Sequence, residues 1–171
     1  MVIRAANEFR DKTSHPNELW QTDFTYLKDI GRGLCYLSTT LDDYSRYVIA
    51  WKPCTTMKAA DATDTQELAL VASACNQATV VHKPKLLSDN GSSYVAADWA
   101  EYLEEKGMDH VRGVPHYPQT RGKVERWHQA MKNGVLLENY YSPGDLERRT
   151  GAFVDHYNNH RYHESLDNRD T

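Results

Sequence analysis

Strand-like segments precede helix-like segments along this chain, and that order limits its possible folds to a few. Three short segments rich in aromatic and β-branched residues come first, separated by polar turn residues. The predicted strands are residues 19–27, 34–41 and 47–52. Because the connections between them are short, the three strands are expected to form an antiparallel meander.

After residue 52 the apolar residues change to a helical period, which predicts helices alternating with short strands. The expected helices are residues 57–75, 94–106, 124–137 and 144–160, and the expected strands are residues 85–87 and 110–114. Gly107 is expected to end the second helix. The predicted apolar stripe of the first helix consists of Ala60, Thr63, Leu68, Val71 and Ala72. An antiparallel start followed by this alternation predicts an α/β fold, with a five-stranded mixed sheet flanked by helices.

The length of 171 residues suits one domain with a real core. Residues 1–16 are polar and aperiodic and are expected to form an N-terminal arm or linker, followed by a core of residues 17–166. Residues 167–171 are expected to be the C-terminal tail of a truncated chain. No apolar run approaches the roughly 20 residues that cross a bilayer, so no membrane contact is expected. The three cysteines are expected to be buried, reduced thiols.

The charge balance is mildly acidic, whereas DNA-binding domains are usually basic. The chain has 20 Lys and Arg against 24 Asp and Glu, a formal net charge of −4. The basic residues are nevertheless clustered, because residues 112–132 contain five of them and a single acid. Such a stripe suits a nucleic-acid enzyme whose main DNA-binding modules lie outside this segment.

Three acidic residues lie where ligand sites of α/β folds gather, at strand ends and helix starts. Asp23 lies in the first predicted strand, Asp89 ends a later strand, and Glu125 lies near the start of a helix. Mg²⁺ prefers oxygen ligands and usually takes only a few carboxylates. Two such ions about 4 Å apart can stabilise both the attacking and the leaving oxygen of a phosphoryl displacement. Three converging carboxylates could hold such a pair.

The spacing of these acids adds a family resemblance, since 35 residues separate Asp89 from Glu125. The pattern resembles the D,D(35)E signature of retroviral integrases and bacterial insertion-sequence transposases. The residues around the acids agree with it in order, and the resemblance covers nearly all of residues 17–166. The matching blocks are residues 20–26, 41–46, 88–91, 118–126 and 157–166.

The resemblance implies an RNase H-like fold and a DDE polynucleotidyl transferase, the catalytic core of a transposase or integrase. Such an enzyme cleaves DNA ends and joins the 3′-hydroxyls to target DNA phosphodiesters. Asp23, Asp89 and Glu125 would be the catalytic residues and the ligands of two Mg²⁺ or Mn²⁺ ions, with Asp23 bridging the pair. DNA would be the substrate, a homodimer or higher homo-oligomer the active form, and the bacterial cytoplasm, at the nucleoid, the location.

The helix that carries Glu125 offers a face for DNA, because residues three, four and seven positions apart share one side. The residues predicted to contact DNA are Arg121, Lys123, His128, Gln129 and Lys132. Arg121 and Lys123 flank Gly122 at the end of the preceding loop, and the resemblance implies that Lys132 touches DNA near the reacting end. The separate apolar stripe predicted to pack on the sheet consists of Val124, Trp127, Met131 and Val135.

Other interpretations compete with the strand-transfer enzyme. One is a metal-dependent nuclease of the same fold, although hydrolysis of RNA–DNA hybrids would need contacts to the 2′-hydroxyl. Another is a non-catalytic DNA-binding or assembly domain that kept the fold, although the presence of all three acids counts against it. Asp42 and Asp43 are expected to shape the turn between the second and third strands rather than to bind metal.

Overall fold

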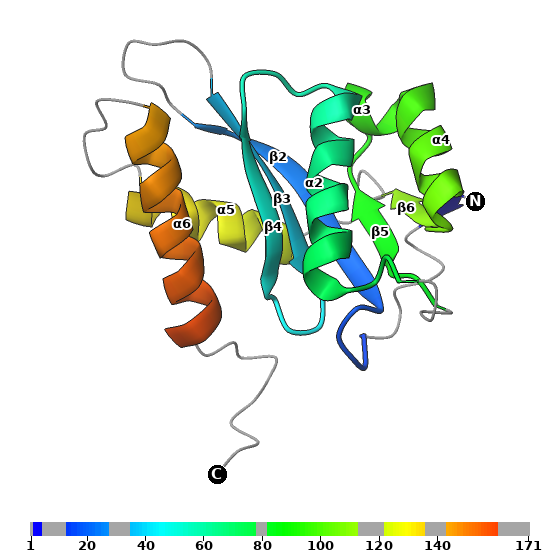
Figure 1. Cartoon of the computed structure of the whole chain (residues 1–171), viewed down its shortest axis with the longest axis horizontal. Coiled ribbons are helices and arrows are strands. Elements are labelled where there is room, and N and C mark those ends of the chain that lie inside the picture. Colours follow the sequence, from blue (N-terminus) through cyan, green and yellow to red (C-terminus); the bar gives the residue numbers. More distant parts are fainter. Residues whose placement is uncertain are drawn as a thin grey trace.

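The structure is a computed structural model that describes residues 2–4, 13–27, 35–77, 82–112, 122–135 and 143–160. A mixed sheet with the strand order β1-β6-β5-β2-β3-β4 forms its centre (Figure 1). The strands are β1 (Val2–Arg4), β2 (Leu19–Leu27), β3 (Cys35–Asp42), β4 (Val48–Cys54), β5 (Lys85–Ser88) and β6 (His110–Arg112). The helices are α2 (Ala59–Ser73), α3 (Ser92–Val95), α4 (Ala97–Lys106), α5 (Gly122–Val135) and α6 (Pro143–His160).

The predicted five-stranded mixed sheet is confirmed, and the structure adds a sixth strand at its edge. Strands β2, β3 and β4 form the expected antiparallel meander, and β5 and β6 run parallel to β2. The additional strand, β1, pairs in parallel with β6. It lies inside the segment expected to be an unstructured arm. Three residues are too few to show a period, so the sequence pattern could not reveal this strand.

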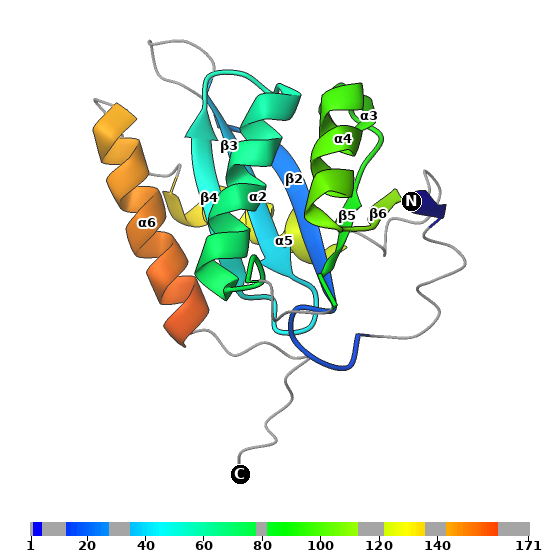
Figure 2. The ribbon, with the colours of Figure 1, turned by 45° about the vertical axis from the view of Figure 1, so that its right-hand side comes forward.

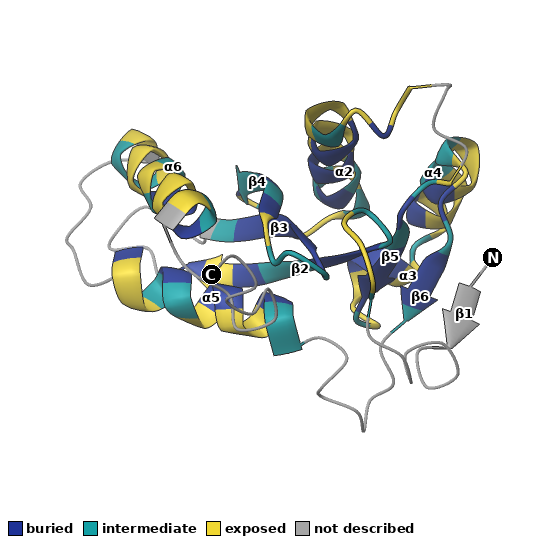
Figure 3. Ribbon diagram, turned by 90° about the horizontal axis from the view of Figure 1, so that it is seen from below, coloured by how far each residue is buried: buried dark blue, intermediate teal, exposed yellow. Residues whose placement is uncertain are grey.

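Helices cover both faces of the sheet and bury two hydrophobic clusters. Helices α2 and α4 lie together on one face (Figure 2), where Trp20, Leu86 and Trp99 are fully buried. Helix α5 lies on the other side (Figure 3), and α6 packs against α5 and β4. Leu41 and Trp127 are fully buried in this second cluster. None of the described helices has both the length and the apolar content to cross a membrane.

The face by which α2 contacts the sheet differs from the predicted stripe. Two members of that stripe, Leu68 and Val71, are 50% and 63% exposed. The buried residues of the helix are instead Ala62, Thr65, Gln66, Ala69 and Leu70. The prediction of this face was therefore wrong.

Hydrogen bonds explain why α2 buries a partly polar face. Gln66 Nε2 donates to the hydroxyl oxygens of Thr22 and Thr40, at 3.1 and 2.7 Å. Thr65 Oγ1 donates to Ser38 Oγ at 2.8 Å. The sheet thus presents hydroxyl groups beneath α2, and buried polar groups need partners. The spacing of apolar residues along the sequence cannot predict a buried face that is partly polar.

The helix and strand boundaries otherwise follow the sequence, with one interruption. The expected helix 94–106 begins at Ser92 but breaks at Ala96, whose extended backbone (φ −67°, ψ 146°) separates α3 from α4. Gly107 ends α4 as predicted, with φ +70° and its N–H directed to carbonyl oxygens of the last turn. Cys54 and Cys75 are buried, as expected, and are not joined in disulfides. The sequence predicts a loop over residues 115–122; residues 115–121 lie outside the described residues, whereas Gly122 begins α5.

The edge strand β4 is closed by a side chain from α6. Asn158 Oδ1 accepts the backbone N–H of Val48 at 2.9 Å, and its Nδ2 donates to the Val48 carbonyl at 3.0 Å. One amide side chain therefore replaces a neighbouring strand at this position. Edge strands that leave such groups open can pair with other chains.

Candidate active site

Asp23 lies on the face of β2 that α5 covers. Side chains alternate along a strand, and Gln21 and Leu27 of this strand contact α5 or its hydrophobic cluster. Asp23 has the same parity and therefore projects to the same side. It is half-buried, and its Oδ1 accepts the backbone N–H of Phe24 at 2.9 Å.

Asp89 follows the neighbouring strand at a matching position. Strands β2 and β5 are parallel, and Gln21 pairs with Leu87. Asp23 lies two residues beyond Gln21 within β2, and Asp89 lies two residues beyond Leu87, directly after β5 ends at Ser88. The Asp89 Oδ1 atom accepts the backbone N–H of Gly91 at 2.8 Å, a bond that closes the turn before α3. The first predicted acid thus lies in β2, and the second directly follows the strand that pairs with β2.

Glu125 is exposed in the first turns of α5, next to a residue that binds β2. The backbone N–H of the buried neighbour Val124 donates to Gln21 Oε1 at 3.1 Å. Gln21 lies two residues before Asp23 on the same face of the strand. The third predicted acid is therefore one residue from a direct contact with the strand that carries the first.

The three carboxylates suit a hard divalent cation by their chemistry but do not form a closed cage. Among the described residues, no group of three or more His, Cys, Asp or Glu side chains lies close enough to hold one metal ion. The donors are nevertheless all carboxylate oxygens, the ligand type that Mg²⁺ prefers. Metal binding at this place would require the carboxylates of Asp23, Asp89 and Glu125 to turn toward one another.

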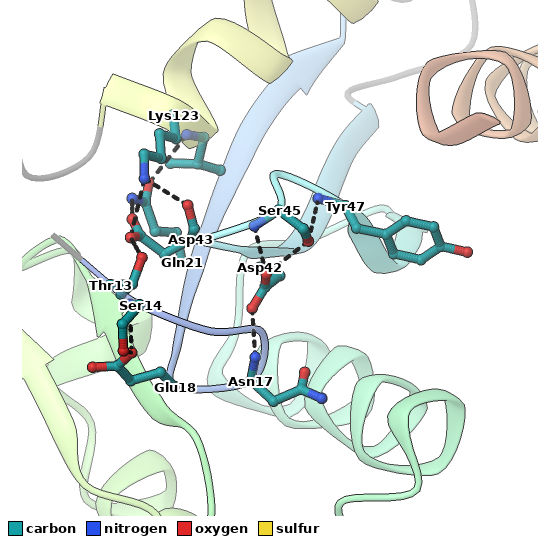
Figure 4. Close-up of polar contacts among 11 residues, drawn as sticks. Thr13, Ser14, Asn17, Glu18, Gln21, Asp42, Asp43, Ser45, Tyr47 and Lys123 are labelled. Carbon is teal, nitrogen blue, oxygen red and sulfur yellow. Dashed lines mark hydrogen bonds and ion pairs between the residues drawn. The ribbon is translucent and has the colours of Figure 1, made fainter. Parts of the chain in front are cut away.

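A buried polar network borders these acids, and it includes Lys123 (Figure 4). Asp43, 8% exposed, accepts Gln21 Nε2 at 2.6 Å through Oδ1 and Thr13 Oγ1 at 2.7 Å through Oδ2. The Lys123 ammonium lies 3.1 Å from the same Oδ2. Lys123 was predicted to contact DNA, but in this structure its charge is paired inside the protein. No sequence pattern indicates this pairing, because 80 residues separate the two partners.

Asp42 has the structural role that was expected of it. Its Oδ2 accepts both the backbone N–H and the hydroxyl of Ser45, each at 2.7 Å (Figure 4). Its Oδ1 accepts the backbone N–H of Asn17 at 2.8 Å. These bonds fix the turn between β3 and β4 to the segment that leads into β2.

The predicted DNA-contacting residues of α5 divide into two groups. Gln129 is exposed and donates to Asn133, and Lys132 is half-buried; both share the helix face of Glu125. His128 is instead buried, 7% exposed, which corrects its assignment to the DNA-facing side. The buried side of α5 therefore includes His128 in addition to the predicted apolar stripe. Arg121 lies outside the described residues.

His110 is a buried titratable residue near the candidate site that the sequence did not single out. Its Nε2 lies 2.6 Å from the hydroxyl of Ser88, the residue before Asp89. Burial lowers the pKa of His110 to about 4, and the charge of Arg112 contributes in the same direction. The imidazole is therefore neutral at pH 7.

Two family models match this chain, and both are described as an integrase core domain. One matches residues 13–118 and the other residues 106–170. Among relatives, the Gag-Pro-Pol polyprotein of mouse mammary tumor virus is 31% identical over 149 residues, which is 84% of this chain and 8% of the polyprotein. The Gag-Pro-Pol polyprotein of squirrel monkey retrovirus is 27% identical over 121 residues, 70% of this chain and 6% of the polyprotein. The chain thus spans only a small part of these relatives.

Solved structures share the fold. The HTLV-2 integrase catalytic core domain in complex with magnesium superimposes with a TM-score of 0.66 at 19% identity, covering 88% of this chain and 92% of that one. A chain of the simian T-cell lymphotropic virus intasome in complex with PP2A regulatory subunit B56 gamma gives a TM-score of 0.69 at 20% identity, covering 89% of this chain and 51% of that one. The predicted RNase H-like fold is therefore confirmed. A matching family model over more than half of its length shows that this chain belongs to the integrase core domain family.

Proposed function

We propose that this chain is the catalytic core of a metal-dependent DNA strand-transfer enzyme, a DDE transposase or integrase. The observation that carries the proposal is the placement of three acids in an integrase core domain. Asp23 lies in β2, Asp89 directly follows the neighbouring parallel strand β5, and Glu125 lies on a helix that is hydrogen-bonded to β2. The reaction would free a 3′-hydroxyl at a DNA end and use it to attack a phosphodiester of target DNA.

In this proposal the three acids hold two Mg²⁺ or Mn²⁺ ions, with Asp23 shared between them. When bound, the ions would stabilise the charge that develops on the attacking and leaving oxygens. The oxygen-only donor set supports this assignment. The magnesium complex of the HTLV-2 integrase core, which shares the fold, supports the choice of metal.

The exposed side of α5 supports a DNA path beside Glu125. We assign contacts with the phosphate backbone to Gln129 and Lys132 and retain Arg121 as a predicted contact. Family members assemble, since the HTLV-2 core was solved in dimeric and trimeric forms, and we propose a homodimer or higher homo-oligomer here. With chromosomal DNA as substrate, a location at the bacterial nucleoid remains part of the proposal.

The test replaces Glu125 by Gln, which keeps the side-chain volume and removes the charge that would hold one metal. Labelled DNA and Mg²⁺ are supplied together with the DNA-binding modules, so that missing end recognition does not mask the chemistry. We expect strand cleavage and joining to fall by about two orders of magnitude or more, because the reaction loses electrostatic stabilisation. The melting temperature without metal should hold or rise.

The matched control is Glu101→Gln, the same change at an exposed helix position of α4 on the opposite face of the sheet. It should leave both activity and stability unchanged. Wild-type strand transfer by the Glu125→Gln variant would end the DDE assignment. Cleavage without joining by the wild-type protein would favour a nuclease, and DNA binding without any chemistry would favour an assembly domain.

A further inference from the structure

We propose that Asp43 is a positioning residue, which sets the place of Glu125 relative to Asp23 through Gln21 and Lys123. We call Gln21, Asp43 and Lys123 the α5 anchor (Figure 4). The inference rests on the proposed function and assigns a role to residues that would not themselves touch metal or DNA. Each step is carried by contacts among buried or half-buried side chains.

The carboxylate of Asp43 is itself held in place from several sides. Its backbone N–H donates to the carbonyl of Leu19 at the start of β2, at 2.9 Å. Thr13 donates its hydroxyl to Oδ2 at 2.7 Å. The neighbouring Asp42 fixes the same turn through Asn17 and Ser45. Asp43 therefore stays fixed relative to β2, the strand that carries Asp23.

Asp43 also determines which way the Gln21 amide points. A side-chain amide has a donor end and an acceptor end, whereas an ionised carboxylate only accepts. Asp43 Oδ1 takes the Gln21 Nε2 donor at 2.6 Å, which turns Oε1 toward α5. Gln21 is 1% exposed, so its amide has no water to replace these partners.

The acceptor end of Gln21, Oε1, binds the first turn of α5. The backbone N–H of Val124 donates to Gln21 Oε1 at 3.1 Å. The first four N–H groups of a helix have no partner within the helix, so this bond satisfies one that would otherwise be buried and unpaired. Glu125 is the next residue, and its backbone position follows from this contact.

Lys123, the residue before Val124 in α5, binds the same carboxylate. Its ammonium lies 3.1 Å from Asp43 Oδ2 and also donates to the Asp43 carbonyl oxygen at 2.5 Å. The side chains of Lys123 and Asp43 are 24% and 11% exposed, so the pair is largely screened from solvent. Hydrogen bonds to charged groups are stronger than neutral ones. Lys123 thus binds Asp43 directly, Val124 is linked to it through Gln21, and these are the two residues before Glu125.

The experiment compares Asp43→Asn, Lys123→Met and the double variant with the wild-type chain. Lys123→Met keeps the aliphatic stem and removes the ammonium, and Asp43→Asn keeps the size and removes the charge. The matched control is Lys52→Met, which breaks the Lys52–Asp64 ion pair (2.6 Å) between β4 and α2. The readouts are the Mn²⁺ affinity by electron paramagnetic resonance, and the hydrogen exchange of the first turn of α5 without metal.

We expect each anchor variant to weaken Mn²⁺ binding by about 10- to 100-fold, the range found when groups that orient metal ligands are removed. The affinity of the double variant for Mn²⁺ should equal that of the single variant with the lower affinity, because both changes release the same helix start. Exchange in the first turn of α5 should accelerate in parallel. Lys123→Arg should retain the affinity, because it keeps the charge, and Lys52→Met should match the wild type. If Asp43→Asn does not fold, the comparison of Lys123→Met with Lys123→Arg tests the inference.

Three outcomes would overturn the inference. Unchanged Mn²⁺ affinity in the anchor variants, with weakened binding in Glu125→Gln, would remove the positioning role and keep the proposed function. A raised KM for DNA and a less steep salt dependence in Lys123→Met alone would make Lys123 a phosphate contact. Unchanged Mn²⁺ binding in Glu125→Gln would remove the proposed function and the inference together.

Discussion

Gln21, Asp43 and His110 are buried polar residues whose partners come from distant parts of the chain. Gln21 meets a backbone N–H that lies 103 residues away, and Ser88 lies 22 residues from His110. Removing one partner of such a pair leaves a buried group unsatisfied, which costs about 1–3 kcal/mol. Single substitutions at these positions therefore test stability and site geometry together.

The neutral, buried His110 predicts a loss of stability in acid. Its pKa lies at about 4 in the folded protein, against 6.5 for an ordinary histidine. As the pH falls below about 6.5, the unfolded chain binds a proton that the folded protein does not, so the free energy of unfolding falls until about pH 4. The difference in the pKa of His110 between the folded and unfolded states lowers the free energy of unfolding by at most about 3 kcal/mol. Urea unfolding at several pH values measures it.

His110→Asn is the control for this pH dependence. The variant is less stable at pH 7 but lacks the titrating imidazole. Its free energy of unfolding should fall less between about pH 6.5 and pH 4 than that of the wild-type protein. Equal slopes in the two proteins would show that His110 is not the responsible group.

The hydrogen bonds of Asn158 to the β4 backbone are expected to stabilise the fold. Asn158→Ala removes both bonds to the backbone of Val48 and leaves edge-strand groups without these partners. We expect a loss of about 1–3 kcal/mol in the free energy of unfolding. Asn159→Ala, the same change at the exposed neighbour, should stay within about 0.5 kcal/mol of the wild type. Similar values for the two variants would contradict the edge-closing role.

At the scale of elements, α5 depends on close contact with α6. A Cβ atom at Gly134 of α5 would overlap the ring of Phe153 on α6, with Cδ2 only 2.8 Å away. Trp127 of α5 also packs against Phe153 and Tyr157 of α6. The place of α5, which carries Glu125, is therefore fixed from the side of α6 as well as from the sheet.

Gly134→Ala should separate these helices, although alanine is the better helix former. We expect a net loss of about 1–3 kcal/mol in thermal or urea unfolding, because the ring has to move. The matched control is Gly151→Ala in α6, where the new Cβ would lie 3.4 Å from Trp51 in ordinary contact. That variant should gain up to about 1 kcal/mol. Stabilisation by both changes would show that α5 and α6 pack less tightly.

At the scale of the whole molecule, an acidic domain carries a short basic stripe. The formal net charge is −4, and Lys123 of the stripe is paired with Asp43. Few positive groups then remain to neutralise phosphates, and affinity for DNA follows the number of phosphates neutralised. Stable binding to DNA ends would need additional modules or additional copies of the chain.

We therefore expect weak and strongly salt-dependent DNA binding by this chain alone. Fluorescence anisotropy over a range of salt concentrations should give a log–log slope of about −0.9 for each phosphate contact. Lys132→Gln should reduce the slope by about one contact. Lys106→Gln, in α4 on the other face of the sheet, should leave it unchanged. Tight, salt-insensitive and sequence-specific binding would contradict this expectation.

The sequence by itself determined the elements and the candidate acids. Segments rich in aromatic and β-branched residues, separated by polar turns, predicted β2, β3 and β4. The amphipathic pattern predicted the packing of Val124, Trp127 and Met131, all of which are fully buried. The acids were identified by their spacing and by the residues around them. Strand order then placed Asp89 directly after the neighbour of the strand that carries Asp23, and the hydrogen bond from Val124 to Gln21 holds the helix of Glu125 against β2.

Only the tertiary structure decided how the polar residues are used. Periodicity reports apolar burial, so it misplaced the face of α2, where Gln66 bonds to the sheet. It also placed His128 outside, because a buried polar residue adds nothing to an apolar pattern. Lys123 changed from a predicted DNA contact to the partner of Asp43. The physical reason is that a hydrogen bond or ion pair depends on two groups at once, and the fold alone brings together groups that lie far apart in the chain.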